Sequence, residues 1–446
     1  MNMTAISLLE QSAGLQEAMF HSLRATSPVA LHGRVVEARG TLVRVAGLDA
    51  KIGELCELRQ GDKILCLAEV TGLINECALL MPHGELDGLS LNTRVIALGH
   101  GHRVPTGDVL LGRVLNGFGY PMDGNGPLQA LAWRTTQGHS PDALQRAPIT
   151  RPFVTGVRSI DGLMTLGIGQ RIGVFAPAGV GKSTLAGMLV KASQADVRVV
   201  ALIGERGREV GEFVHQTLGP SGMRNSVVVA ATSDSSASER VKAGFVATAI
   251  AESFRDRGQS VLLVMDSVTR LARALREIGL ASGEPPTRRG FPPSVFATLP
   301  RLLERAGNSV NGSITALYTV LMEGEDDTDP IAEEVRSILD GHIVLTRAIA
   351  QTQQYPAIDV LLSLSRLMQS VTSVKHQAAA HHVRSLIARH RDIELLLQVG
   401  EYRSGSDPVA DEAIAKLPTI KAFLSQSATH AENLTQSLLR LEELAA

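Results

Sequence analysis

Residues 171–190 read RIGVFAPAGVGKSTLAGMLV, and this stretch decides the fold. RIGVF has the composition of a buried strand, and STLAGMLVKA has that of a helix. Between them, Gly179 and Gly181 allow the backbone to turn its N–H groups inward, and Lys182 and Ser183 follow directly. A strand, a glycine turn and a helix that begins near a Lys-Ser pair predict a phosphate-binding loop.

The loop predicts how a nucleotide is held. Lys182 is expected to pair with the β- and γ-phosphates of ATP, and the hydroxyl of Ser183 to ligate Mg²⁺. Ala176 takes the place of the first glycine of the usual pattern, which changes none of these groups. A chance glycine turn is disfavoured because strand, loop and helix agree. The predicted nucleotide-binding residues are Gly179, Val180, Gly181, Lys182, Ser183 and Thr184.

A second nucleotide-binding element is expected on a later strand. VLLVMD is a run of apolar residues that ends in Asp266. Ligands of open α/β sheets bind at the carboxyl ends of the strands, so Asp266 is predicted to hold the Mg²⁺ shell. An aspartate after an apolar strand is often only a helix N-cap. Its combination with the phosphate loop favours the metal role.

Hydrolysis also requires a group that orients or deprotonates water. LIGERGREV at 202–210 places Glu205 after another apolar run, with Arg206 and Glu209 close by. Glu205 is predicted to position the attacking water, with Arg206 as a further catalytic group and Glu209 as a third metal ligand. A solvated surface cluster of charges explains the same residues equally well at this point.

The bulk composition limits the function classes. The chain has 446 residues, 44% hydrophobic and 20% charged, which is typical of two or three globular domains. A net charge of -2 and 3% aromatic residues disfavour nucleic-acid binding. No apolar run reaches the roughly 18–20 residues of a membrane span. The three cysteines lack metal-ligand spacing and are expected to be reduced packing residues.

Changes of texture along the chain predict its domains. We expect an N-terminal helical segment at 1–27, helical mainly over 5–25, and a β-barrel of short strands at 28–97. Alternating strands and helices predict an α/β core at 98–373. A helical C-terminal domain is expected at 374–446. The expected core strands are 172–176, 197–203, 226–231, 260–266, 313–321 and 342–347.

Two smaller patterns add expectations. Ser236 and Glu239 have the spacing of a capping box at the start of a helix. Histidines crowd the start of the C-terminal domain without a carboxylate at ligand spacing, so a solvated helix face is favoured over a metal site. These are His376, His381, His382 and His390.

Several long stretches carry a family resemblance. TGVRSIDGLMTLGIGQRIGVFAPAGVGKST, GERGREV, VLLVMDSVTRLARALREIGLASGEPPTRRGFPPSV and EEVRSILDGHIVL resemble the ATPases of type III protein secretion. These ATPases are relatives of the catalytic subunit of the rotary ATP synthase. The resemblance runs from about residue 30 to about residue 420. It implies a RecA-like P-loop core between an N-terminal β-barrel and a C-terminal helical domain, assembled as a homohexamer.

The resemblance also implies roles that spacing alone does not show. QYPAID is similar to the segment whose tyrosine stacks on adenine, so Tyr355 is the expected base platform. SLSRLM is similar to the segment with the arginine finger, so Arg366 is expected to reach the γ-phosphate held by a neighbouring subunit. The loops 283–295 and 323–330 are expected to contact a central coiled-coil stalk protein.

The same resemblance implies a cellular role. ATP hydrolysis with Mg²⁺ would release chaperones from cargo and unfold the cargo for export. Further expected partners are a peripheral stator or regulator, an export gate and chaperone–effector complexes. The expected location is cytoplasmic, at the inner face of the bacterial inner membrane. An injectisome (virulence) ATPase is favoured over a flagellar one, and a rotary synthase subunit, an RNA-translocating hexamer and a non-catalytic ring remain as alternatives.

Overall fold

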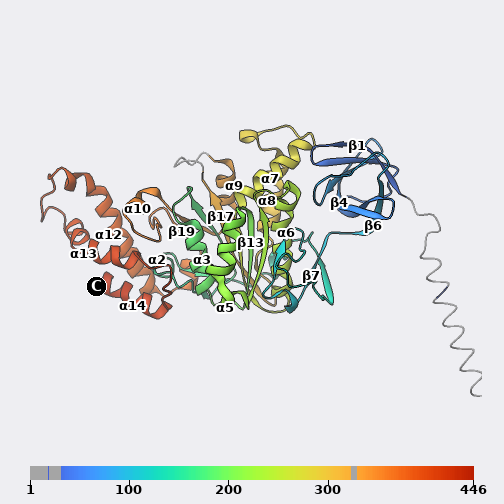
Figure 1. Ribbon diagram of the computed structural model, residues 1–446. Coiled ribbons are helices and arrows are strands. Elements are labelled where there is room, and N and C mark those ends of the chain that lie inside the picture. Colours follow the sequence, from blue (N-terminus) through green and yellow to red (C-terminus); the bar gives the residue numbers. More distant parts are fainter. Residues whose placement is uncertain (1–18, 20–31, 323–328) are drawn as a thin grey trace, which may run out of the picture. The chain divides into compact units, whose positions relative to one another are not determined.

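The computed structural model describes residue 19 and residues 32–322 and 329–446 (Figure 1). The helix expected over 5–25, apart from Met19, lies outside these residues, and so does most of the acidic turn at 323–330. Two compact units divide the chain, Met1–His100 and Gly101–Ala446.

The first unit is a closed six-stranded barrel with the strand order β1-β2-β5-β4-β3-β6. Buried apolar side chains from the strands fill its interior, and Val43, Leu58 and Leu80 are among them. Cys56 packs in the same interior. The barrel predicted from the short strands is thereby confirmed. Its strands are β1 (Gly33–Arg39), β2 (Leu42–Ala46), β3 (Glu54–Gln60), β4 (Lys63–Ile74), β5 (Cys77–Pro82) and β6 (Arg94–Gly101).

The second unit is built on a nine-stranded sheet with the path β19-β18-β12-β17-β15-β13-β14-β8, and β16 pairs with β17 at its side. The pairs along this path are parallel, except that β19 runs antiparallel to β18. The predicted RecA-like α/β core is confirmed. The strands are β8 (Val114–Asn116), β12 (Arg171–Ala176), β13 (Val197–Glu205), β14 (Ser226–Thr232), β15 (Ser260–Asp266), β16 (Gly307–Asn308), β17 (Ser313–Leu321), β18 (Gly341–Val344) and β19 (Leu364–Ser365).

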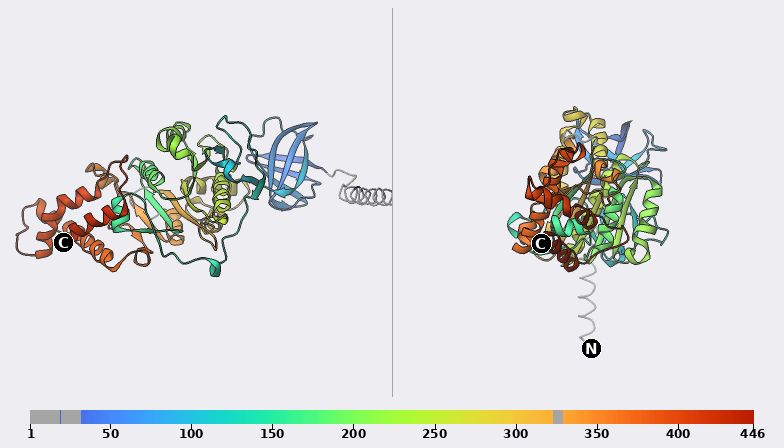
Figure 2. Two further views of the ribbon diagram at one scale, coloured as in Figure 1. Left: turned by 90° about the horizontal axis from the view of Figure 1, so that it is seen from below. Right: turned by 90° about the vertical axis from the view of Figure 1, so that its left-hand side faces the viewer.

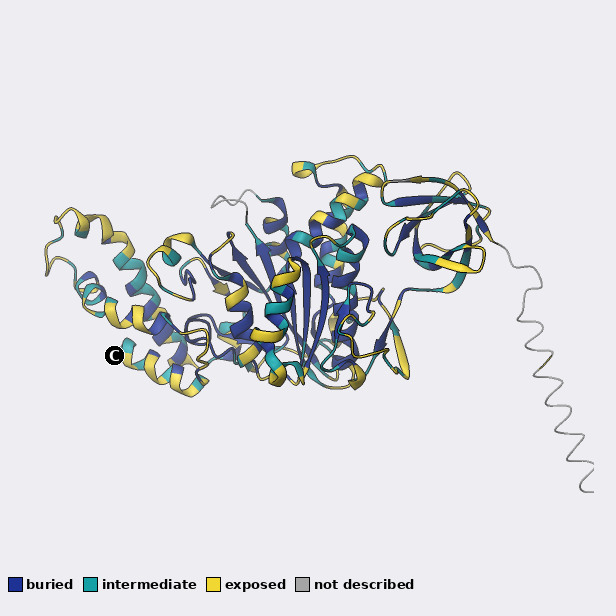
Figure 3. Ribbon diagram, viewed as in Figure 1, coloured by how far each residue is buried: buried dark blue, intermediate teal, exposed yellow. Residues whose placement is uncertain are grey.

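Helices cover both faces of this sheet, so its central strands are buried at nearly every position (Figure 3). One face packs against α6 (Ala237–Asp256), α7 (Val268–Ala281), α8 (Pro293–Leu303) and α9 (Pro330–Ile338). The buried residues of the other face form one cluster with residues of α2 (Arg158–Leu163), α3 (Lys182–Ala192) and the C-terminal helices. The sheet therefore holds its strand ends, and the loops after them, in fixed positions.

The C-terminal helices are α12 (Val374–Gln398), α13 (Pro408–Leu424) and α14 (Leu434–Ala445), which contact one another and α2 (Figure 2). The solvated face expected for the histidines is wrong for His376, which is buried and bonds to the Gly162 carbonyl at 2.7 Å. His382 instead contacts Glu412 at the surface. The described residues contain no group of three or more His, Cys, Asp or Glu side chains that could hold a metal ion, so the histidines form no metal site there.

Two local expectations change in detail. The strand expected at 342–347 ends at Val344, because the hydroxyl of Thr346 accepts a hydrogen bond from Ile349 N and starts α10. Ser236 caps Glu239 N as expected, but the Glu239 carboxylate accepts from Gly117 N instead of closing the capping box. The shorter elements are β7 (Arg103–Thr106), β9 (Ala132–Thr135), β10 (Pro152–Phe153), β11 (Leu166–Gly167), α4 (Gly207–Glu212), α5 (Gly219–Met223), α10 (Arg347–Gln351) and α11 (Met368–Val371).

Candidate active site

The phosphate loop lies between the end of β12 and the start of α3. Gly179 and Gly181 have φ of 84° and 93°, a left-handed conformation that favours glycine. Gly181 is the N-cap of α3 and provides no side-chain hydrogen bond, so the first N–H groups of the helix remain available for an anion. Ala176 is the last residue of β12 and is fully buried, so this position lies in the strand and does not need a glycine.

The side chains of Lys182 and Asp266 form an ion pair at the carboxyl end of β15. The Lys182 Nζ lies 2.5 Å from Asp266 Oδ1, and both side chains are buried. The same oxygen accepts a hydrogen bond of 2.7 Å from the hydroxyl of Thr319 on β17. Because β15 and β17 are parallel neighbours, their register brings these two side chains together. Lys182, which is expected to bind phosphate, therefore forms an ion pair with Asp266, which is expected to ligate the metal.

Glu205 ends β13 beside this pair, and it is 6% exposed. Its carboxylate lies 3.9 Å from Lys182 Nζ and 3.3 Å from a guanidinium nitrogen of Arg270. Burial raises the pKa of Glu205 to about 7, and a hydrogen bond to Glu209 and the charge of Asp266 act in the same direction. The surface-cluster interpretation therefore does not hold for Glu205. A carboxylate with this pKa can accept or release a proton near neutral pH.

Arg206 and Glu209 lie farther out than Glu205. The Arg206 side chain is 75% exposed and that of Glu209 36%, and they approach each other to 3.9 Å across the start of α4. Both residues line a cavity of about 770 Å³ that Lys182, Ser183 and Glu205 also line. The oxygen donors of Ser183, Glu205 and Glu209 thus line one cavity, and the Asp266 carboxylate contacts Lys182 next to it. Hydroxyl and carboxylate oxygens are the ligands that Mg²⁺ prefers, so this donor set fits the metal.

Tyr355 lies next to the phosphate loop. A Cβ built on Gly181 would lie 3.9 Å from the Tyr355 ring, and the side chain is half-exposed. Its carbonyl accepts a hydrogen bond of 2.8 Å from Gln426 N, in the segment after α13. Ala428 of that segment lines the same cavity as Lys182. Residues of the core and of the segment between α13 and α14 therefore line one cavity.

Arg366 lies far from this space in its own chain. It follows β19, is exposed, and its backbone N–H donates to the carbonyl of Asp340, whose own N–H donates to that of Arg171. Arg171 is at the amino end of β12, whereas the phosphate loop follows the carboxyl end. At about 3.3 Å per residue the two ends are about 16 Å apart. Arg366 therefore lies at the opposite ends of the strands from the phosphate loop of the same chain.

Two residues at the site were missed from the sequence. Arg270 crosses Gly204, where an added Cβ would lie 2.8 Å from its Cδ, and so reaches Glu205. Its position in the first turn of α7, four residues after Asp266, is a weak signal that could have indicated it. Thr319 carries no local signal, because only the pairing of β15 with β17 brings it to Asp266.

The fold and the site define a class. A phosphate loop after β12 and buried acidic side chains at the ends of the parallel strands β13 and β15 are the arrangement of a RecA-like P-loop nucleotide-binding protein. Among the residues that the structure describes, no helix is both long and apolar enough to cross a membrane.

Comparisons with known proteins narrow this class. Residues 156–365 match the ATP synthase alpha/beta family, nucleotide-binding domain, and residues 35–99 match the β-barrel domain of the same family. Residues 372–443 match the T3SS EscN ATPase C-terminal domain. The chain is 60% identical to the type 3 secretion system ATPase of Xanthomonas euvesicatoria over 89% of this chain and 90% of the relative. The chain belongs to the type 3 secretion system ATPases.

Two further relatives place the chain within that family. It is 50% identical to the flagellum-specific ATP synthase of Treponema pallidum (strain Nichols), over 91% of each chain. The assembled ATPase EscN in complex with its central stalk EscO, from the enteropathogenic E. coli type III secretion system, is 46% identical with a TM-score of 0.86. That comparison covers 93% of this chain and 100% of the EscN chain. The higher identity to the Xanthomonas ATPase favours the injectisome over the flagellar branch.

Proposed function

We propose that this chain forms a homohexameric ring that uses ATP hydrolysis to release chaperones from cargo, unfold the cargo and drive its export through an injectisome. The observation that carries the proposal is the 60% identity to a type 3 secretion system ATPase over nearly the whole chain. Lys182 and Glu205 line one cavity and Asp266 pairs with Lys182, which supports ATP as the substrate.

Each group around the cavity has a proposed task. Residues 179–184 wrap the phosphates with backbone N–H groups, and Lys182 leaves Asp266 to pair with the β- and γ-phosphates. Ser183, Asp266 and Glu209 are the proposed oxygen ligands of Mg²⁺, which when bound neutralises charge on the phosphates. Glu205 holds the attacking water and takes its proton, and Arg206 supports the charge at the mouth of the cavity.

Two groups complete the site from outside this cluster. Tyr355 provides the platform on which the adenine stacks, which its position beside Gly181 supports. Arg366 completes the site of a neighbouring subunit, and its location at the far ends of the strands supports this assignment. A site divided between two subunits makes ATP turnover depend on the ring.

The proposed partners follow the relatives. EscN has been solved assembled with its central stalk EscO. We propose that the loops 283–295 and 323–330 contact a corresponding coiled-coil stalk, and the exposed Arg288 and Arg289 of the first loop provide positive charge for an acidic stalk face. A peripheral stator, an export gate and chaperone–effector complexes are the further proposed partners. The proposed location is the cytoplasmic face of the bacterial inner membrane.

The experiment that tests the proposed function is a deletion strain complemented with the wild-type gene. We expect the deletion to abolish effector secretion and to leave swimming motility intact. The 50% identity to a flagellum-specific ATP synthase makes flagellar export the second candidate, and that function predicts the loss of motility instead. ATPase activity that depends on added RNA would contradict both export functions in favour of an RNA-translocating hexamer.

The pKa of Glu205 predicts how activity depends on pH. A raised carboxyl pKa means that the proton is held up to about pH 7 in the free protein, so the ionised form that can take a proton from water appears only above that pH. We therefore expect kcat/KM for ATP to fall about tenfold per pH unit below about pH 7. The measurement is phosphate release at low ATP and excess Mg²⁺ over a pH series. An acid limb near the ordinary glutamate pKa would contradict the assignment of Glu205.

A further inference from the structure

Arg158 is a buried arginine that fastens the C-terminal helices to the core. It is 7% exposed, at the start of α2. Its guanidinium donates to the carbonyls of Phe423, at 2.9 Å, and of Ala422 and Ser425, at the end of α13. Its remaining nitrogen pairs with the buried carboxylate of Glu432 at 2.8 Å. The planar guanidinium thus bonds to residues at both ends of one segment, residues 422–432, and holds this segment against the core.

Gln426 connects the segment 422–432 to Tyr355, the proposed platform for the base. The Gln426 side chain accepts from Arg158 N at 2.9 Å and donates to the carbonyls of Gly156 and His430 at 2.7 Å each. Its backbone N–H donates to the Tyr355 carbonyl. Two residues farther on, Ala428 lines the nucleotide cavity. The bonds of Arg158 therefore fix both the backbone of Tyr355 and the cavity wall at Ala428.

A glycine in the same place shows how closely this segment is docked. Gly156 has a φ of 72°, and an added Cβ would lie 2.6 Å from the Cβ of Ala192 and 3.2 Å from that of Ala431. Ala192 ends α3, the helix that begins at the phosphate loop. Gly156 therefore fits closely between the segment at Ala431 and the carboxyl end of α3, which is the end away from the phosphate loop. A shift of the segment changes the distance between Tyr355 and Ala428.

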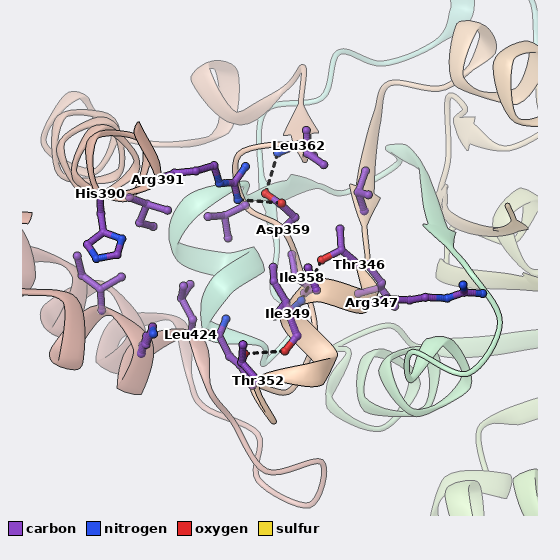
Figure 4. A pocket seen from close by; sticks show the side chains of 18 of the residues that line it. Thr346, Arg347, Ile349, Thr352, Ile358, Asp359, Leu362, His390, Arg391 and Leu424 are labelled. Atoms are coloured by element: carbon purple, nitrogen blue, oxygen red, sulfur yellow. Dashed lines mark hydrogen bonds and ion pairs between the residues drawn. The ribbon is translucent and has the colours of Figure 1, made fainter. Parts of the chain in front are cut away.

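The loop that carries Tyr355 borders an open space on one side, although residues 356–360 after it are buried. Residues on both sides of Tyr355, among them Thr346, Ile349 and Ile358, line a second cavity of about 840 Å³ between the core and α12 and α13 (Figure 4). The ion pair of Asp359 with Arg391, at 2.9 Å, crosses this cavity. Backbone bonds to Val344 and Thr346 hold the residues after Tyr355, and the bond from Gln426 N holds Tyr355 itself next to the open space.

We propose that Arg158 is a positioning residue for the nucleotide base: it sets the distance between the platform of Tyr355 and the wall at Ala428, and it leaves the phosphate-binding groups unaffected. The inference rests on the proposed function, in which ATP binds at this cavity. Arg158 lies on α2 and contacts neither the phosphates nor the base. In this proposal it controls how much of the free energy of nucleotide binding comes from the base.

The test separates the base from the phosphates by comparing ADP with inorganic pyrophosphate. Calorimetric titration of the full chain is expected to show that Arg158→Lys weakens ADP about tenfold, the effect of losing one stacking contact, and pyrophosphate less than about twofold. Lysine keeps the charge and cannot reach three carbonyls and a carboxylate together. In steady state, KM for ATP is expected to rise with kcat retained, the sign of lost uniform binding.

Gln426→Met and Arg305→Lys complete the design. Gln426→Met removes the three side-chain hydrogen bonds with little change in volume, and it is expected to reproduce the selective loss of ADP affinity. It therefore provides the test if Arg158→Lys does not fold. Arg305 is 1% exposed and paired with Glu252 far from the base, so Arg305→Lys is a matched control for the loss of a buried arginine. It is expected to lower thermal stability and to leave the ratio of ADP to pyrophosphate affinity unchanged.

Two outcomes would overturn the inference, and a third concerns the proposed function alone. An equal loss of ADP and pyrophosphate affinity in both variants would mean that the segment supports the whole site. Unchanged ADP affinity in both folded variants would mean that Arg158 is only structural. Wild-type protein that binds pyrophosphate but gains nothing from the adenosine of ADP would contradict the proposed base site itself.

Discussion

Glu205→Gln is expected to lower ATP turnover by more than about a hundredfold while nucleotide binding is retained, because a general base of this kind contributes about that much or more. Glutamine has nearly the same shape as glutamate and can still fill the buried position at the end of β13. It cannot take a proton from water, and it cannot balance the charges of Lys182 and Arg270, which lie 3.9 Å and 3.3 Å from the carboxylate. The measurements are phosphate release and ADP titration on the same preparation.

A second carboxylate tests whether the effect is specific. Glu277 lies on α7 in an exposed pair with Arg240, at 2.9 Å, so Glu277→Gln removes one negative charge outside the cavity. We expect its turnover to stay within about twofold of wild type, since exposed ion pairs contribute little. A Glu205→Gln protein with wild-type kcat would exclude Glu205 as the group that activates water. Loss of ADP binding together with turnover would assign it a structural role instead.

Arg366→Ala is expected to reduce turnover by about 10³-fold or more, the usual contribution of an arginine finger. The side chain cannot serve its own phosphate loop, because its backbone is bonded to Asp340 at the opposite ends of the strands. The proposed role therefore places it at the site of a neighbouring subunit. Mixing Arg366→Ala with Lys182→Ala subunits tests this directly, because an interface between them can combine the intact lysine of one with the intact arginine of the other.

The mixing experiment has a quantitative form. If subunits exchange at random, about one interface in four is intact at an equal ratio, and recovered activity follows the product of the two fractions. Activity in mixed rings is thus expected to pass through a maximum at equal amounts. The control replaces the Arg366→Ala partner with a Lys182→Ala, Arg366→Ala double variant, which is expected to restore nothing. A shared site is excluded if verified mixed rings show no recovery at any ratio.

The prediction of the phosphate loop from the sequence needed only local information. Strand β12, the two glycines and α3 are contiguous, and each follows from the residues at its own position. The same holds for the barrel strands, whose alternation is visible along the chain, and for the position of Asp266 at the end of an apolar run. The sequence left two interpretations of Glu205 open, because GERGREV is equally typical of a charged cluster at the surface. Burial at the end of a central strand decided between the two interpretations.

The sequence by itself determined the class of this protein, because the phosphate loop and the strand–helix alternation are encoded in short contiguous stretches. Only the tertiary structure decided which side chains meet: Thr319 with Asp266, Arg270 with Glu205, and Arg158 with Glu432, which is 274 residues away. It also placed Arg366 at the end of the sheet away from its own phosphate loop. Such contacts depend on strand register and on the packing of distant helices, and no periodicity within a single segment records either of them.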